Sequence, residues 1–150
     1  MPSARIIVCE KTGQWAIALR RLLARGGHRV HETRSWSACW AELERHPASL
    51  LVAEMTAQNV ELMLERLTDL PRRFRQARAV VVGDRDLARY EWAVRTAGAA
   101  HAVFTPRGLP PAARLIVRHL ALAPEPELSL REAVWRRLPW RRKSEISSSK

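Results

Sequence analysis

Short runs of apolar residues that do not alternate with polar ones most constrain how this chain folds. A strand buried on both faces of a parallel sheet has this pattern, whereas a strand with one face in water alternates. The unbroken runs are 5–10 (RIIVCE), 50–53 (LLVA) and 79–82 (AVVV), with a further strand expected over 100–104 (AHAVF) and an alternating edge strand over 28–34 (HRVHETR). We therefore predict five strands at these positions.

Amphipathic segments separate the predicted strands. Trp15, Leu19 and Leu22 recur at spacings of three and four, which places them on one face of a helix that ends at Gly26 and Gly27. Four further helices are predicted: one after the cap Ser35, one over 60–67 that ends by Pro71, one from the cap Asp86 through Ala97, and one that starts at Pro110 and Pro111. Strands that alternate with helices over short crossovers predict an α/β fold with a doubly wound, parallel, five-stranded sheet.

Size and composition fit one folded domain, and we expect it in the cytoplasm. The chain has 150 residues, of which 47% are hydrophobic, so it can bury a core. No apolar run approaches the roughly 18 residues of a membrane span, and the first residues lack the pattern of a signal peptide. Cys9 and Cys39 have no metal-ligand spacing around them, and we expect two reduced, packed thiols.

The sequence offers no motif for catalysis or cofactor binding. Its glycines form neither a G-x-G-x-x-G nor a G-x-x-x-x-G-K loop, no serine lies in a nucleophile elbow, and the five histidines show no metal-ligand spacing. We therefore predict no enzyme activity, no metal, no cofactor and no small-molecule substrate. The tryptophans at 15, 36, 40 and 92 fall on helical positions, where we expect packing in the core or in grooves, with one or two of the four left exposed.

The chain is strongly basic. It carries 26 Lys and Arg residues against 15 Asp and Glu residues, which gives a formal net charge of +11. Such a charge favours an acidic partner. A GC-rich genome, which encodes arginine more often than lysine, would produce the same composition, and this alternative stays open.

Two stretches resemble the receiver domain of bacterial response regulators. The first is RIIVCEKTGQWAIALRRLL (5–23), which is similar to the family's first strand, acidic loop and first helix. The second is GAAHAVFTPRGLPPAARLIVRHL (98–120), which is similar to its fifth strand, Lys-Pro step and last helix. The resemblance implies a CheY-like domain over residues 4–122 with strand order 2-1-3-4-5.

The resemblance also implies where phosphorylation chemistry would lie, and the sequence departs from the family there. In the family, two adjacent acids hold Mg²⁺, an Asp after the third strand accepts the phosphoryl group, and a hydroxyl residue and a Lys-Pro step contact the phosphate. The matching positions here are Glu10, Lys11, Glu54, Gly83, Thr105 and Pro106. The ammonium of Lys11 competes with a metal ion, and Glu54 carries its carboxylate one methylene too far for attack. The implied class is a degenerate pseudo-receiver.

Three functions remain as hypotheses. The first is a non-catalytic signalling or scaffold domain that binds a protein partner independently of phosphorylation, with Glu54 paired to Lys11; drift of both residues at a solvated pocket edge is the alternative to that pairing. The second is a basic nucleic-acid-binding adapter, and the third is a weak phosphoacceptor in a phosphorelay. By resemblance, the partner or homodimer face would carry Tyr90, Arg95, His101 and Arg107.

The C-terminal segment has a different composition from the domain. We predict a linker over 123–128, an amphipathic helix over 129–143 and a disordered tail over 144–150. The residues predicted to bind a partner are Trp135, Arg136, Arg137, Trp140, Arg141 and Arg142. Tryptophan with arginine suits a protein interface, an anionic membrane surface, a nucleic acid or docking on the domain itself, and these alternatives stay open.

Overall fold

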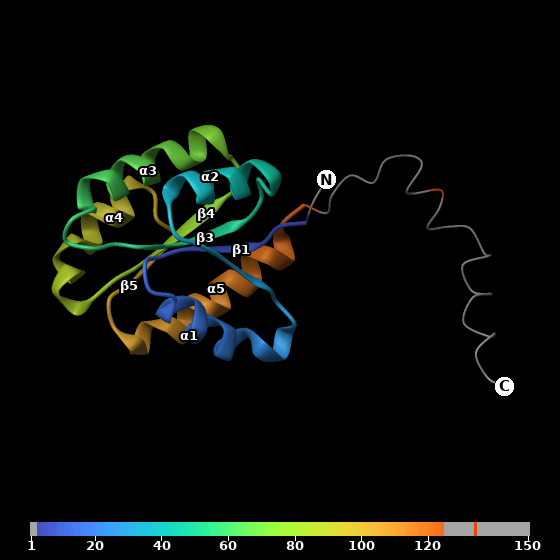
Figure 1. Cartoon of the computed structure of the whole chain (residues 1–150), viewed down its shortest axis with the longest axis horizontal. Helices are drawn as coiled ribbons and strands as arrows, with labels where there is room; N and C mark the ends of the chain where they lie inside the picture. The colour runs from blue at the N-terminus through green and yellow to red at the C-terminus, as the bar shows by residue number, and fades with distance from the viewer. Residues whose placement is uncertain (1–2, 125–133, 135–150) are drawn as a thin grey trace.

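The computed structural model describes residues 3–124 and residue 134 of the chain. The predicted helix 129–143 and tail 144–150, with most of the predicted linker, lie outside the described residues apart from Val134. The described part forms a parallel sheet with a layer of helices on each face (Figure 1). None of its helices is long and apolar enough to cross a membrane.

Five parallel strands form the sheet in the order β2-β1-β3-β4-β5, which confirms the predicted fold class. The strands are β1 (Ile6–Cys9), β2 (Val30–Thr33), β3 (Leu50–Glu54), β4 (Arg78–Val82) and β5 (His101–Val103). Ile6 at the start of β1 is in register with Val30 of β2 and Leu50 of β3. The carboxyl ends of β1 and β3 therefore lie side by side.

Five α-helices cover the two faces of the sheet. They are α1 (Gln14–Leu23), α2 (Trp36–Arg45), α3 (Val60–Arg73), α4 (Glu91–Ala97) and α5 (Leu109–Leu122), with short 3₁₀ helices η1 (Ala24–Gly26), η2 (Arg85–Tyr90) and η3 (Pro106–Gly108). Helices α1 and α5 lie on one face, and α2, α3 and α4 lie on the other (Figure 1). The Ser35 hydroxyl accepts a hydrogen bond from the Ala38 N–H at 3.1 Å, as predicted for a cap.

Two helix boundaries differ from the sequence prediction. Helix α3 continues through Pro71 to Arg73, because the last turn loses only the N–H of the proline, and the Phe74 N–H still bonds the Leu70 carbonyl at 2.8 Å. The helix predicted from Asp86 instead starts as a 3₁₀ turn after Asp84. This tighter turn brings Leu87 into the core before α4 begins.

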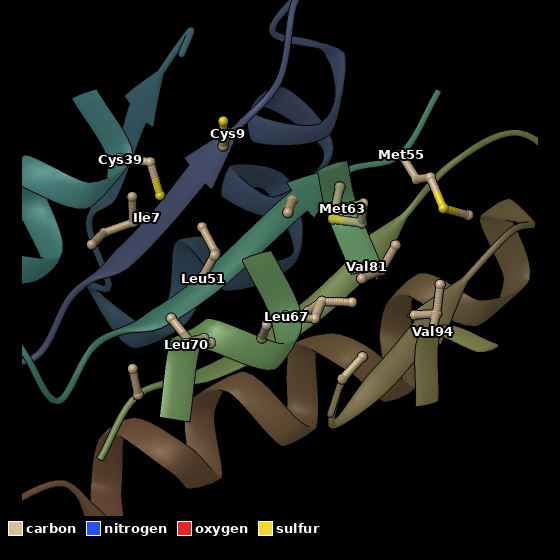
Figure 2. Packing of buried hydrophobic residues seen from close by; sticks show 14 of the residues in the cluster. Ile7, Cys9, Cys39, Leu51, Met55, Met63, Leu67, Leu70, Val81 and Val94 are labelled. Carbon is tan, nitrogen blue, oxygen red and sulfur yellow. The ribbon is translucent and has the colours of Figure 1, made fainter. Parts of the chain in front are cut away.

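The sheet is buried on both faces, which explains its continuous apolar runs. Ile7, Leu51 and Val81 point to the helices α2, α3 and α4, as Figure 2 shows. Their neighbours along the strands, such as Val8 and Val52, point to α1 and α5. Both faces of the central strands therefore contribute apolar burial to the stability of the fold.

We expect Leu51→Ala to lower the free energy of unfolding by about 2–5 kcal/mol, because the change leaves a cavity in the middle of the sheet. The matched control is Leu62→Ala, at a partly exposed position on α3, for which we expect a loss below about 1 kcal/mol. Urea denaturation followed by tryptophan fluorescence measures both values. Equal losses for the two variants would contradict the two-sided core.

Candidate functional site

Two adjoining clefts lie at the carboxyl edge of the sheet and collect most of the predicted site residues. The first, of about 390 Å³, is lined by Lys11, Glu54 and Gly83 among other residues. The second, of about 350 Å³, is lined by Gly83, Thr105 and Pro106. Both clefts share Gln14, Trp15, Gly83 and Asp84. Five of the six predicted positions thus surround one continuous region, and Glu10 is the exception.

Glu10 is turned into the protein and caps helix α1. Its side chain is only 3% exposed, and its two carboxylate oxygens accept hydrogen bonds from the N–H groups of Trp15 at 2.9 Å and Ala16 at 3.0 Å. The cap residue of α1 itself, Gly13, contributes no side-chain bond. Glu10 therefore satisfies two N–H groups at the start of α1 and places a negative charge at the positive end of that helix.

Arg34, which the sequence analysis did not single out, completes the surroundings of Glu10. Its Nη1 donates to the Glu10 carbonyl at 3.4 Å and lies 4.0 Å from the Glu10 carboxylate, while Nη2 bonds Glu32 at 3.3 Å. The guanidinium also lies against Gly13, where a Cβ atom would come within 3.0 Å of Nη2 and where φ is +88°. Only glycine suits that position. The signal in the sequence was an arginine directly after an edge strand.

Glu54 contacts Lys11 through the backbone and not through the predicted ion pair. The Glu54 carboxylate accepts a long hydrogen bond, 3.5 Å, from the Lys11 N–H. Among residues 3–124, no ion pair involves the Lys11 ammonium. Asn59, also missed by the sequence analysis, holds this loop: its amide donates to the Glu54 carbonyl at 3.0 Å and accepts from the Thr56 N–H at 2.8 Å. An Asn that precedes a predicted helix was the available signal.

Gly83 follows β4 at a position where a side chain would be in tight contact with the neighbouring loop. A Cβ atom there would lie 3.0 Å from the Met55 carbonyl oxygen and 3.3 Å from Leu87. The Met55 N–H donates a hydrogen bond to the Val82 carbonyl at 2.7 Å, so the β3–α3 loop lies against the end of β4. A side chain at position 83 would require the Met55 carbonyl to shift by a few tenths of an ångström.

The acids around the first cleft do not form a metal site. Glu54, Asp84 and Asp86 all line it. Within the part of the chain that the structure describes, however, no group of three or more His, Cys, Asp or Glu side chains converges closely enough to hold a metal ion. Lys11, a basic residue, lines the same cleft. The cleft is therefore a mixed-charge surface and not a cluster of oxygen ligands.

The two cysteines, distant in sequence, meet between β1 and α2. Both thiols are free and buried, as expected for packed thiols, and Figure 2 shows them on facing elements. A hydrogen bond from the Cys39 thiol lowers the pKa of Cys9. The same hydrogen bond, together with burial, raises the pKa of Cys39.

The next set of predicted residues is the partner-binding face, Tyr90, Arg95, His101 and Arg107, and the contacts of the structure connect only some of them. The pKa of His101 is lowered, first by its partial burial and then by the positive charge of Arg95, another residue of the predicted face. Tyr90 lies under the guanidinium of Arg89, 4.9 Å from its ring centroid, and Arg107 is exposed on η3. The tail residues Trp135, Arg136, Arg137, Trp140, Arg141 and Arg142 lie outside the described residues.

Trp92 is the exception among the four tryptophans on helical positions, of which one or two were expected at the surface. Trp40 is buried and makes edge contacts with Trp36 and Phe74, and Trp15 packs against the core. Trp92 on α4, in contrast, is 79% exposed. The first turn of α4 directs position 92 outward because Leu87 and Val94 occupy the inward positions.

Comparisons with known proteins identify the fold but no family. The sequence matches no protein-family model and no curated protein. Among solved structures, a response regulator from Thermotoga maritima superposes with a TM-score of 0.64 at 16% identity, over 80% of this chain and 99% of that one. A CheY-like protein, TadZ, from Pseudomonas aeruginosa PAO1 gives a TM-score of 0.64 at 18% identity, over 78% and 99%. An orphan response regulator of Helicobacter pylori gives 0.61 at 15%, over 79% and 99%.

These likenesses define the class of fold. The chain has the CheY-like receiver fold, with its sheet order and both helix layers. The identities are too low to transfer an activity, so the function rests on the geometry of this chain.

We expect Glu10→Gln to lower the free energy of unfolding by about 1–3 kcal/mol, because the amide can cap only one of the two N–H groups that the carboxylate caps. Thr12→Ala, at an exposed position in the same loop, is the control and should change stability by less than about 0.5 kcal/mol. Chemical denaturation measures both. A neutral Glu10→Gln would show that the cap does not stabilise the domain.

Proposed function

We propose that this chain is a pseudo-receiver, a signalling or scaffold domain that binds a protein partner without being phosphorylated. The proposal rests on the residues that line the cleft at the carboxyl edge of the sheet. Lys11 and Glu54 line it, while Glu10, the acid that follows β1, is occupied as the cap of α1. The cleft thus offers little of what phosphoryl transfer requires.

The chemistry of the reaction supports this view. Mg²⁺ binds through several oxygen ligands in near-octahedral array, and phosphoryl transfer depends on charges positioned around the transferred group. Gly83 brings no hydroxyl and Thr105 no ammonium to the positions that match the family's phosphate contacts. Because two N–H groups hold the Glu10 carboxylate, turning it toward the cleft would uncap α1.

The exposed face of α4 supports a partner-binding role. Trp92 stands in solvent beside the ion pair of Glu91 and Arg95, whose Oε1 and Nη2 atoms are 3.0 Å apart. Tryptophan and arginine carry much of the affinity in protein interfaces. We assign this face, with His101 on the adjacent β5, as the partner-binding surface.

We expect the full chain to gain no phosphoryl group when it is incubated with acetyl phosphate and Mg²⁺ and examined by intact mass at neutral pH. The matched positive variant is Lys11→Asp with Glu54→Asp and Thr105→Lys, which rebuilds three positions of the family's pattern and should gain measurable Mg²⁺ affinity. A stable phosphoryl group on the unaltered chain would contradict the proposal and favour the phosphoacceptor alternative.

We expect Trp92→Ala to weaken binding of the protein partner by about 2 kcal/mol or more, which is roughly 30-fold. Leu62→Ala, partly exposed on α3, is the control and should leave binding unchanged. Quantitative pull-down with the full chain and both variants, followed by titration of the proteins that only Trp92→Ala loses, measures the effect. If both variants retain the same proteins at the same affinity, the α4 face is not the binding surface.

A further inference from the structure

The two helix layers differ sharply in charge. The sequence contains no Asp or Glu over 11–31 or over 92–124, the stretches that include α1, η1, η3 and α5. The opposite layer carries acids on each helix, including Glu42 and Glu44 on α2 and Glu61, Glu65 and Asp69 on α3. Since α1 and α5 cover the same face of the sheet (Figure 1), that face is an acid-free surface.

Most arginines of this layer lack acidic partners; the exception is Arg20 on α1, which pairs with Glu32 of β2 at 2.7 Å. Arg21, Arg25, Arg114 and Arg118 are exposed, and none of them forms an ion pair within residues 3–124. On the other layer, Arg45, Arg72, Arg73 and Arg95 are each paired with a carboxylate. Apart from that of Arg20, the positive charges of the α1/α5 layer are therefore not neutralised within the described part of the protein.

Apolar side chains lie among these arginines. Leu22 and Val117 line a groove of about 430 Å³ between α1 and α5, together with Arg114 and Arg118. Ile17 and Leu122 lie outside the lining of the groove and are 51% and 74% exposed. Exposed apolar groups thus follow both helices and are not confined to one slot.

We propose that the α1/α5 layer docks on a membrane surface rich in anionic phospholipid. In that arrangement the arginine guanidinium groups donate hydrogen bonds to lipid phosphates, while Leu22, Val117 and Leu122 enter the headgroup region. A nucleic acid would leave these apolar side chains against a polar backbone, and an acidic helix seated in the groove would leave Ile17 and Leu122 in water. The proposal stands independently of the pseudo-receiver function.

The test is co-sedimentation of the full chain with vesicles of phosphatidylcholine containing about 30 mol % phosphatidylglycerol, compared with phosphatidylcholine alone. We expect binding only to the anionic vesicles. Arg114→Glu with Arg118→Glu should weaken it by roughly tenfold or more, because four units of charge change at the contact. The matched control, Arg72→Glu with Arg75→Glu on the α3 side, changes net charge equally and should weaken binding by less than about threefold.

A second measurement separates this layer from the basic C-terminal segment. A nitroxide attached at Val117→Cys should become accessible to lipid-soluble oxygen on binding, whereas one at Arg75→Cys should stay accessible to water-soluble reagents; the native cysteines are buried. Three outcomes would overturn the proposal. They are no binding to anionic vesicles, equal losses for the two arginine pairs, or a nitroxide at position 117 that stays in water. Duplex DNA that displaces the vesicles through the same arginines would assign the surface to nucleic acid instead.

Discussion

Burial of β1, β3 and β4 on both faces is the constraint on which the rest of the structure depends. A strand covered on both sides needs a helix layer above and below, and parallel strands with short crossovers supply one helix after each strand. The register of Ile6 with Leu50 then brings the loops after Cys9 and Glu54 together at one edge. The candidate site is a consequence of this burial, because its residues come from separate parts of the chain.

At that edge, several residues hold the fold together, whatever the function of the site. Glu10 caps α1, Gly83 lets the β3–α3 loop approach β4, and Asn59 ties that loop to the end of β3. These roles leave little freedom for the loops to switch. A domain whose edge is held in this way is suited to presenting one constant surface, which agrees with binding that does not depend on phosphorylation.

The apolar runs were sufficient to predict the strands, and the family resemblance implied their order, but neither predicted the direction of individual side chains. Apolar runs such as 50–53 and 79–82 indicate strands that are buried on both faces, and few folds of this chain length bury strands in that way. Glu10 was placed correctly at the end of β1, yet its carboxylate turns toward α1. It does so because the free N–H groups at the start of that helix lie beside it in the folded protein, and the sequence does not show this proximity. Likewise, Trp92 has a helical spacing but lies outside, since the 3₁₀ turn before α4 changes which positions face the sheet.

The two proposed surfaces lie on opposite faces of the sheet, and this arrangement has a mechanical consequence. Trp92 belongs to α4, which packs through Val94 on the same side as α2 and α3, whereas Arg114 and Val117 belong to α5 on the other side. A partner bound at α4 would therefore not cover the arginine surface, and each contact could form while the other is present. Because both faces pack on one rigid sheet, such a domain would hold a protein partner at a fixed distance from an anionic surface, and it could do so without any phosphorylation step.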